Sequence, residues 1–334
     1  MSHELSTVGH GDHSPACLDE ESWPKAQGSG LTAQSSELKA QSSELKAHSS
    51  RLSAYANLIK PHVTVLLLAV TALTMVMAAR GMPDPGILVA TLLGGLMAAG
   101  SANAINCYLD RDIDRLMGRT MRRAVPSGKI PPRHALVFGL LLAVVSYVEM
   151  LLLVNLLAAS LALSGILFYV IVYTGLLKRT TPQNIVIGGA AGAVPALVGW
   201  AAVTGTVSLP AFLLFTIIFY WTPPHFWALA LLIKPDYERA QIPMLPVVRG
   251  DRETRWQIFL YCWLLLGVTL LLFSTGTMGY LYLVTALALG GGMLYLSFRL
   301  LRSESKRWAH RLFWYSNSYL AILFAVMALD SVIR

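Results

Sequence analysis

The sequence is poor in charge: only 13% of its 334 residues are Asp, Glu, Lys or Arg, whereas 55% are hydrophobic. Its mean hydropathy is +0.57. A soluble domain normally contains about 25% charged residues, so this composition excludes an ordinary soluble globular protein. Cysteine is also scarce. Cys17, Cys107 and Cys262 lack the paired spacing of a disulfide framework or a zinc site, and we expect three free thiols.

Long apolar runs are abundant, by contrast, and each has about the twenty residues that cross ~30 Å of hydrocarbon. Because lipid offers the backbone no hydrogen-bond partner, each run is predicted to be a helix. The predicted fold class is therefore all-α: a polytopic membrane helical bundle of about nine transmembrane helices, with eight or ten as alternatives and two long loops after the second and sixth spans. The predicted spans cover residues 63–79, 86–105, 136–153, 157–177, 184–203, 209–233, 257–275, 278–298 and 312–330.

Basic residues are almost absent from every second loop. The loops on one side, together with the C-terminus, contain only Arg80 and Arg334. Seven, two, five and five Lys or Arg residues lie in the other loops, at 106–135, 178–182, 234–256 and 299–311. This positive-inside asymmetry predicts a cytoplasmic location for the basic loops and for the N-terminus. Topology thus explains much of the net charge of +8, and we expect no nucleic-acid partner.

The first 52 residues are polar and contain no signal-peptide hydrophobic region. AQSSELK occurs at 33–39 and again at 40–46, but one leucine per seven residues is too few for a coiled coil, which uses two. We predict a disordered polar tail at 1–52 and a membrane domain at 53–334. The tail has seven acidic and four basic residues, which is unlike an organelle transit peptide. We therefore expect a multi-pass protein of the bacterial inner membrane rather than of the mitochondrial one.

Asn106, Asp110 and Asp114 are spaced four residues apart where the second predicted span ends. This spacing places the side chains on one helical face, about 5–6 Å apart. Carboxylate and amide oxygens are the hard ligands that Mg²⁺ takes, and a bound cation would explain how two like charges coexist. The alternative is a solvated interfacial helix with ordinary ion pairs, in which Asp112 and Arg115 pair with each other.

Basic residues gather at the same predicted membrane edge. Arg119, Arg122 and Arg123 follow the acidic residues, and Lys178 and Arg179 follow the fourth predicted span. Guanidinium groups bind phosphate oxygens through forked donors. An acidic metal face beside several cations therefore predicts a polyanionic ligand, although Lys178 and Arg179 taken alone could equally be positive-inside anchors.

The spacing Asn106-x-x-x-Asp110-x-x-x-Asp114 resembles the first signature of the UbiA-type membrane prenyltransferases. These helical-bundle enzymes use Mg²⁺ to bind an isoprenyl diphosphate. Within that superfamily the chain is similar to the haem O synthases (protohaem IX farnesyltransferases). The stretches that carry this resemblance are NCYLDRDIDRLMGRT at 106–120, LKRTTPQNIVIGGAAGAVPALVGWAAVTG at 177–205 and WTPPHFWALALLIKPDYERAQIPMLPVVRG at 221–250.

The resemblance implies transfer of a farnesyl group from farnesyl diphosphate to a vinyl group of haem B, with a haem A synthase as an implied downstream partner. It implies that Asn106, Asp110 and Asp114 hold magnesium diphosphate, together with Asp236 from the second long loop. The superfamily's second signature has two aspartates four residues apart, whereas Ala240 occupies the second position here, so this metal site has fewer ligands. The diphosphate would also contact Arg119, Arg123, Lys178 and Arg179.

Few ionisable side chains lie inside the predicted spans, and such groups often mark function. Glu149 and His225 are the clear cases. The prolines in WTPPHFW predict a kinked backbone at His225. The resemblance suggests that His225 ligates haem iron or positions the porphyrin, with Tyr173, Trp221 and Trp227 near the acceptor. The alternative is a structural histidine bonded to a neighbouring carbonyl or hydroxyl group.

Gly188, Gly189 and Gly192 either leave room for a farnesyl chain or allow close helix packing. A related prenyltransferase that acts on a quinone precursor or a chlorophyll-type acceptor is the first rival, but it would be expected to have the second pair of aspartates. A transporter is the rival from another class. Transport sites usually lie near the bilayer midplane on broken helices, whereas the carboxylates here gather at one membrane edge.

Overall fold

The computed structural model describes residues 53–334, so the expectations for the tail and for Cys17 lie outside the described part of the chain. Every regular element of this part is helical, and nine helices are long and apolar enough to cross a membrane. The predicted all-α fold with nine spans is confirmed. The spans are α2 (Pro61–Ala79), α3 (Pro85–Leu109), α5 (Pro132–Leu153), α6 (Leu156–Leu167) continued by the π-helix η1 (Phe168–Leu177), α7 (Asn184–Thr204), α8 (Leu209–Leu232), α11 (Gly250–Ser274), α12 (Tyr280–Arg302) and α13 (Lys306–Ile333).

Local sequence explains where several helices begin and end. Pro61, Pro85 and Pro132 open α2, α3 and α5, where a missing N–H group costs no helical hydrogen bond. The Asp84 carboxylate caps α3 by accepting a hydrogen bond from the Ile87 N–H at 2.9 Å. Two spans start earlier than their apolar runs, α11 at Gly250 and α13 at residue 306. Hydropathy marks only the lipid-buried part of a helix, whereas its backbone hydrogen bonds continue through charged first turns.

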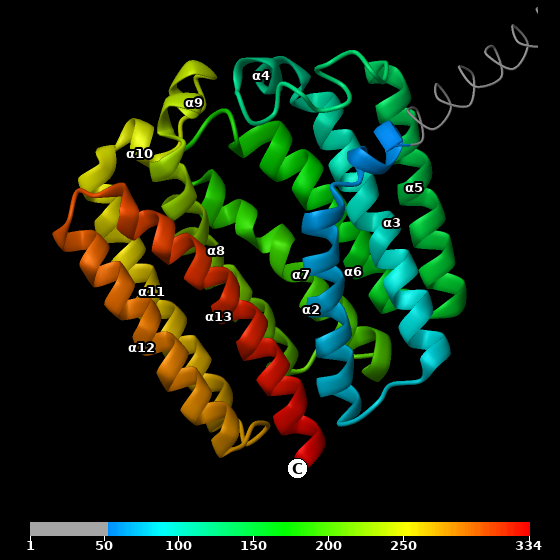
Figure 1. Cartoon of the computed structure of the whole chain (residues 1–334). Helices are drawn as coiled ribbons and strands as arrows, with labels where there is room; N and C mark the ends of the chain where they lie inside the picture. The colour runs from blue at the N-terminus through cyan, green and yellow to red at the C-terminus, as the bar shows by residue number, and fades with distance from the viewer. Residues whose placement is uncertain (1–52) are drawn as a thin grey trace, which may run out of the picture. The chain divides into compact units, whose positions relative to one another are not determined.

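The spans form a closed circuit of neighbours, in the order α2, α3, α5, α6, α7, α8, α11, α12, α13 and back to α2 (Figure 1). Other contacts cross this circuit, and the most extensive are those of α2 with α7 and of α8 with α13. One hydrophobic core lies among α8, α11, α12 and α13 and contains the buried rings of Trp227, Tyr282 and Tyr319. A second core lies mainly among α3, α5, α6 and α7 and contains many alanines, which allow close helix packing. Cys107 and Cys262 are buried free thiols.

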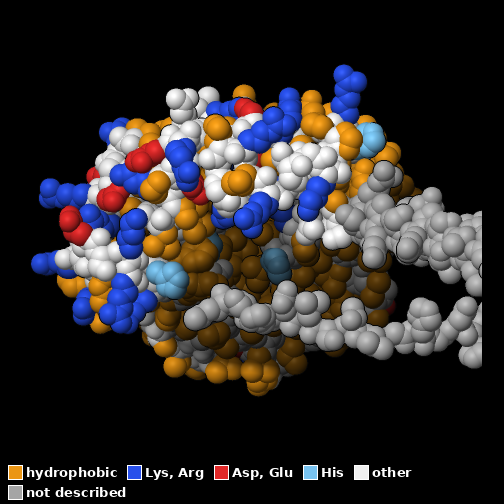
Figure 2. Space-filling model, turned by 45° about the horizontal axis from the view of Figure 1, so that its top comes forward, with side chains coloured by type: hydrophobic (Ala, Val, Ile, Leu, Met, Phe, Trp, Pro, Cys, Tyr) orange, Lys and Arg blue, Asp and Glu red, His pale blue; other side chains and the backbone are white. Residues whose placement is uncertain are grey.

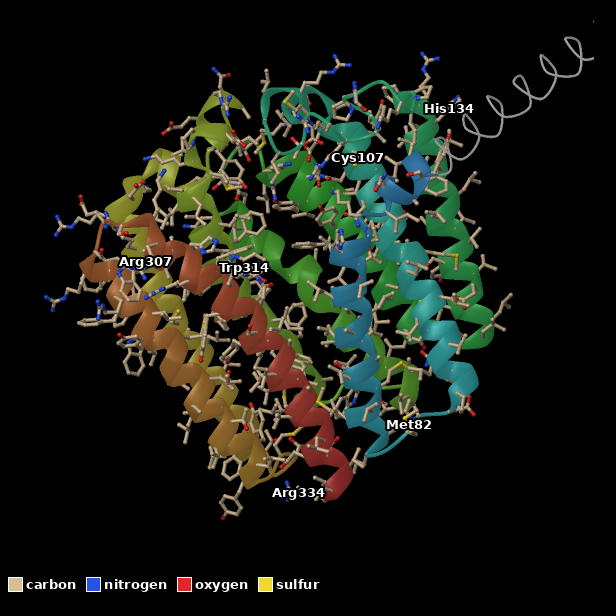
Figure 3. All side chains as sticks on the ribbon, viewed as in Figure 1. Met82, Cys107, His134, Arg307, Trp314 and Arg334 are labelled. Atoms are coloured by element: carbon tan, nitrogen blue, oxygen red, sulfur yellow. The ribbon has the colours of Figure 1, made fainter. Side chains whose placement is uncertain are left out.

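Three short helices lie at one end of the bundle: α4 (Arg111–Leu116), α9 (Lys234–Arg239) and α10 (Leu245–Val248) (Figure 1). They belong to the two long loops expected after the second and sixth spans. Charged side chains cover this end, which we call the polar end, while hydrophobic side chains cover the flank below it (Figure 2). His134 and Arg307 lie near the polar end, and Met82 and Arg334 lie at the opposite end (Figure 3).

Candidate active site

The three predicted acidic-face residues lie together and are buried at the polar end. Asn106, Asp110 and Asp114 are 3%, 0% and 2% exposed. The helical register continues from α3 into α4, because the Asp110 N–H donates to the Asn106 carbonyl at 2.9 Å and the Asp114 N–H donates to the Asp110 carbonyl at 2.8 Å. The Asn106 side-chain amide also donates to Asp110 Oδ2 at 2.6 Å. This face is therefore enclosed by protein and is not the solvated interfacial helix of the alternative interpretation.

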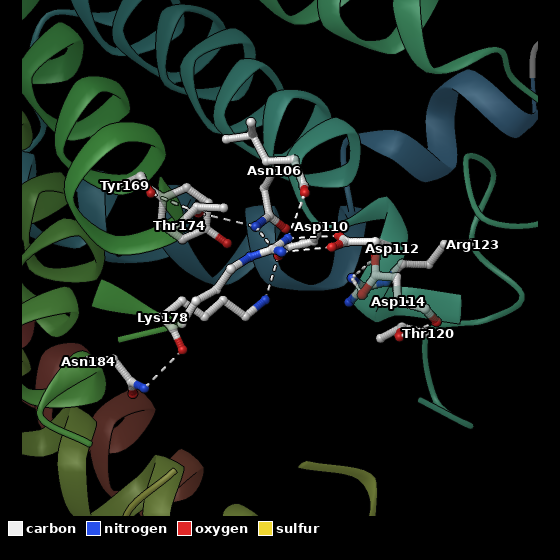
Figure 4. Close-up of polar contacts among 12 residues, drawn as sticks. Asn106, Asp110, Asp112, Asp114, Thr120, Arg123, Tyr169, Thr174, Lys178 and Asn184 are labelled. Carbon is white, nitrogen blue, oxygen red and sulfur yellow. Dashed lines mark hydrogen bonds and ion pairs between the residues drawn. The ribbon is translucent and has the colours of Figure 1, made fainter. Parts of the chain in front are cut away.

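Basic side chains from separate segments contact both carboxylates (Figure 4). Lys178 Nζ lies 2.5 Å from Asp110 Oδ2. The Arg123 guanidinium donates to both carboxylate oxygens of Asp114, at 3.0 and 2.8 Å. A tight turn returns Arg123 to this position, because the Thr120 hydroxyl donates to the Asp114 carbonyl at 2.9 Å. Two of the four predicted diphosphate-binding residues thus contact the acidic face.

Arg179 has a different partner. Its guanidinium donates to both oxygens of Asp112 at 2.7 Å, and it lies 3.9 Å from Asp110 Oδ1. Hydrogen bonding to Arg179 lowers the pKa of Asp112 to about 2. Asp112 lies on the outer side of the helix, as its two-residue offset from Asp110 predicts, but it pairs with Arg179 rather than with Arg115.

Sequence reasoning missed Lys60. Its Nζ lies 2.9 Å from Asn106 Oδ1, and burial of the ammonium group lowers its pKa to about 8. The Lys60 backbone is left-handed, with φ 52° and ψ 66°, a conformation that costs a non-glycine residue energy and often occurs at functional sites. The Asn103 amide stabilises this segment by donating to the Ile59 carbonyl at 3.0 Å. A lysine next to the start of a span usually reflects the positive-inside rule, so the sequence did not indicate this contact with Asn106.

The fourth span reaches the site through a π-helix. In η1 the Lys178 N–H donates to the carbonyl of Tyr173, five residues earlier, at 2.9 Å. The Thr174 hydroxyl accepts a hydrogen bond from the Asn106 amide at 3.2 Å, which places η1 directly against the acidic face. π-helical turns are rare and are frequent at functional sites. The rings of Tyr169 and Tyr173 are in contact, tilted by 32° with 5.4 Å between their centroids, and Gly188 of α7 makes room for the Tyr173 ring.

The second long loop faces the first. A Cβ atom at Gly118 would lie 3.9 Å from Asp236 Oδ1, so Asp236 lies against the turn that follows α4. Its carboxylate forms an ion pair with Arg239. The neighbouring Tyr237 is 2% exposed, and its burial raises the pKa of its hydroxyl group while the positive charge of Arg119 opposes this change. Arg119 itself is exposed.

The predicted acceptor residues lie in three different places. His225 and Trp221 stack together on the α13 side of α8, at 4.4 Å between ring centroids. Trp227 packs edge-on against Tyr261 of α11, and it lines a cavity of about 250 Å³ with residues of α10 and α11. Tyr173 lies in η1 against α7. Residues 225 and 227 point in different directions because two helical residues span about 200°. α8 continues without interruption through the two prolines of WTPPHFW.

The acidic face fits a divalent cation. Asp110 Oδ1 is buried and has no hydrogen-bond partner, and a buried carboxylate oxygen of this kind is costly unless a cation binds it. Asn106, Asp110 and Asp114 supply the hard oxygens that Mg²⁺ prefers. Among residues 53–334 no three His, Cys, Asp or Glu side chains form a metal cluster of their own. The remaining ligands would therefore come from waters and from the oxygens of a bound anion.

These features define a polytopic membrane protein with a buried acidic face, flanked by basic side chains, at one end of a helical bundle. Residues 65–318 match the UbiA prenyltransferase family, and the chain belongs to that family. This confirms the resemblance found in the sequence and identifies the protein as a prenyltransferase of this family.

The chain is similar to several bacterial enzymes. A protoheme IX farnesyltransferase of Gloeobacter violaceus is 55% identical over 77% of this chain and 85% of its own length. Those of Symbiobacterium thermophilum and a Nostoc species are 54% and 53% identical, over 77% of this chain and 86% and 82% of their own lengths. Among solved structures, a digeranylgeranylglyceryl phosphate synthase has a TM-score of 0.72 at 19% identity, covering 85% of this chain and 99% of that one. A UbiA homologue of Archaeoglobus fulgidus bound to GPP and Mg²⁺ has a TM-score of 0.59 at 14% identity, over 82% and 99%.

Proposed function

We propose that the protein is a protohaem IX farnesyltransferase, a haem O synthase that transfers the farnesyl group of farnesyl diphosphate to a vinyl group of haem B. The observation that carries this proposal is the buried face of Asn106, Asp110 and Asp114, with a carboxylate oxygen that has no hydrogen-bond partner and with cations on both sides. The choice of substrates rests on the bacterial relatives of that name.

We place this multi-pass protein in the bacterial inner membrane, with the polar end and the N-terminus in the cytoplasm. The support is the charge of the loops: basic residues concentrate at the polar end, and positive-inside asymmetry assigns such loops to the cytoplasm. Farnesyl diphosphate is then bound with its charged group at the polar end and its apolar chain between the spans. A haem A synthase is the class of enzyme that would use the product.

The first half of the reaction breaks the bond between C1 of the farnesyl group and the diphosphate oxygen, which keeps the electron pair. Asn106, Asp110 and Asp114 would hold Mg²⁺, which would neutralise the charge of this leaving group. Lys178, Arg123 and Lys60 already lie at these three side chains. They supply fixed positive charge where negative charge develops, and one preorganised donor of this kind contributes ~3–4 kcal/mol to transition-state stabilisation.

Three other proposed site residues lie around the edge of the acidic face: Asp236, Arg119 and Arg179. Asp236 faces the turn after α4, so a movement of the Arg239 side chain would free its carboxylate for a cation. Arg119 is exposed at this edge, and Arg179 reaches the acidic face only at 3.9 Å while Asp112 holds it. We therefore assign Arg119 and Arg179 to capture of the diphosphate and Asp236 to completion of the metal site.

In the second half of the reaction a vinyl carbon of haem B donates its π electrons to C1 of the farnesyl group. The new C–C bond leaves a cation on the neighbouring carbon, which the porphyrin stabilises. Water adds to this carbon and loses a proton, so the products are a hydroxyethylfarnesyl haem and diphosphate. This sequence needs no protein nucleophile and no covalent enzyme intermediate.

The test uses the full-length protein in lipid nanodiscs with haem B, farnesyl diphosphate and Mg²⁺, followed by mass analysis of the pigment. We expect a farnesylated, hydrated haem, and its formation should stop when EDTA removes the metal. Asp110→Asn should lower turnover at least about a hundredfold, since it weakens the metal site. Asp251→Asn is the matched control because Asp251 is an exposed carboxylate at the same end of the bundle.

Two results would reject different parts of the proposal. Prenylation of an aromatic quinone precursor, with haem B left unmodified, would reject the acceptor but keep the reaction class. Full turnover of the Asp110 variant would reject the acidic face as the diphosphate site.

A further inference from the structure

Two short contacts at one serine determine which nitrogen of His225 carries a proton. The Ser316 hydroxyl oxygen lies 2.7 Å from His225 Nδ1 and 2.7 Å from the Phe313 carbonyl oxygen. Two oxygen atoms at this distance need a proton between them, so the single hydroxyl proton points to the carbonyl group. The proton of the other contact must then belong to the imidazole. His225 is therefore protonated at Nδ1, and its Nε2 holds a lone pair.

The surroundings keep this imidazole in place. Trp221 stacks on one face and Phe313 on the other, with ring centroids at 4.4 and 4.7 Å and interplanar angles of 15° and 24°. The Trp221 indole N–H donates to the Ser316 carbonyl at 2.7 Å, so α8 and α13 are joined twice at this level. No Asp, Glu, Lys or Arg side chain of residues 53–334 forms an ion pair or hydrogen bond with His225. The imidazole is therefore oriented by neutral groups.

Nε2 is the ring atom left for a ligand. It has no hydrogen-bond partner in the described part of the chain, whereas Nδ1 contacts the hydroxyl group of Ser316, which is completely buried. A histidine that ligates a metal through one nitrogen typically donates its other N–H to an oxygen acceptor, which sets the tautomer and the ring orientation. His225 and Ser316 have this arrangement before any metal is present.

We propose that Nε2 of His225 is an axial ligand to the iron of the haem acceptor and that Ser316 is the positioning residue that holds the imidazole in the ligating tautomer. This inference rests on the proposed function, since it requires haem as the acceptor. His225 lies seven residues before the end of α8 at Leu232, or ~10 Å below the polar end at 1.5 Å per residue. Haem held at this depth lies among the spans, where the apolar prenyl chain extends from the diphosphate.

The test measures haem binding without farnesyl diphosphate, so that it is independent of turnover. Haem B is titrated into the full-length protein in nanodiscs, and the ferric and ferrous absorption spectra report the axial ligand. We expect a wild-type spectrum typical of imidazole ligation. His225→Ala should lose it, and added imidazole should restore it, because the free base can enter the space that the side chain leaves.

Ser316→Ala tests the positioning role. Removing an outer hydrogen-bond partner typically weakens metal binding about 10–100-fold, so the haem dissociation constant should rise by that factor. Ser316→Thr keeps the hydroxyl group and should restore tight binding. Ser318→Ala is the matched control: Ser318 is an exposed serine two residues along α13, 3.5 Å from the Trp314 carbonyl, and its substitution should leave haem affinity unchanged.

The outcomes separate this inference from the proposed function. If the His225 variant binds haem with the wild-type spectrum and farnesylates it, the ligand assignment is overturned while the function stands. If Ser316→Ala lowers only the melting temperature and leaves haem affinity unchanged, Ser316 is structural and the positioning role is overturned. If the wild type binds no haem and prenylates another acceptor, the proposed function itself fails.

Discussion

Replacing Lys178 by methionine tests the electrostatics of the acidic face most directly. Lys178 Nζ contacts Asp110 at 2.5 Å, and the two side chains are 13% and 0% exposed. Methionine keeps the apolar part of the lysine side chain but removes its charge. Arg179 provides the matched control: it is the next residue and also pairs with an aspartate, but that pair is 40% and 58% exposed.

The expected losses of unfolding free energy differ severalfold. Removing one partner of a buried ion pair costs ~3–5 kcal/mol, because the remaining charge is uncompensated. Asp110 still accepts a hydrogen bond from Asn106 at 2.6 Å, so we expect the lower end of this range, about 3 kcal/mol. An exposed pair contributes ~0–1 kcal/mol, so Arg179→Met should cost less than about 1 kcal/mol.

Magnesium distinguishes this explanation from a simple packing defect. Without Lys178 the Asp110 carboxylate is available to a divalent cation, and a ligand at 100 times its Kd stabilises the folded state by about 2.7 kcal/mol. We therefore expect Mg²⁺ to restore most of the stability lost by Lys178→Met and to stabilise wild type and Arg179→Met less. Denaturation of the protein in detergent micelles, with and without Mg²⁺, measures both quantities. Equal losses in the two variants, or equal Mg²⁺ increments in all three proteins, would refute the assignment of a buried cation site to Asp110.

Three further substitutions test other parts of the structure. Lys60→Met should weaken binding of Mg²⁺–farnesyl diphosphate about 10- to 150-fold, since it removes a charge-assisted contact worth ~1.5–3 kcal/mol. Unchanged binding by calorimetry would exclude Lys60 from the site. Gly188→Ala should cost ~1–3 kcal/mol because its methyl group meets the Tyr173 ring, whereas Gly192→Ala has open space and should cost nothing measurable by thermal denaturation. Glu149→Leu should raise the unfolding free energy by ~1–3 kcal/mol with unchanged turnover, because both buried carboxylate oxygens lack partners; lower turnover would instead assign Glu149 a function.

The nine spans and the acidic face were predictable because they depend on local rules. Hydrocarbon thickness sets the length of an apolar run, and the lack of hydrogen-bond partners in lipid makes that run a helix. The 3.6-residue period places Asn106, Asp110 and Asp114 on one face and turns Asp112 away from it. These properties need only the order of residues along the chain.

The partners of that face were decided by tertiary structure. Lys60 reaches Asn106 across 46 residues, through a left-handed backbone that has no signature in the composition around it. η1 brings Thr174 and Lys178 to the face as a π-helix, in which the Lys178 N–H donates to the carbonyl of Tyr173, five residues earlier. This spacing changes the helical register from the one that a regular α-helix predicts.

The residues predicted to contact the haem acceptor show the same difference between what the sequence predicts and what the tertiary structure decides. The sequence singled out His225 as an ionisable group within a span, but nothing near it in the chain indicates Ser316 or Phe313, which lie about 90 residues away on α13. It also grouped Trp227 with His225, whereas the structure places Trp227 against α11. Residue order sets which face of a helix a side chain occupies, but only the packing of helices against one another determines what that face meets.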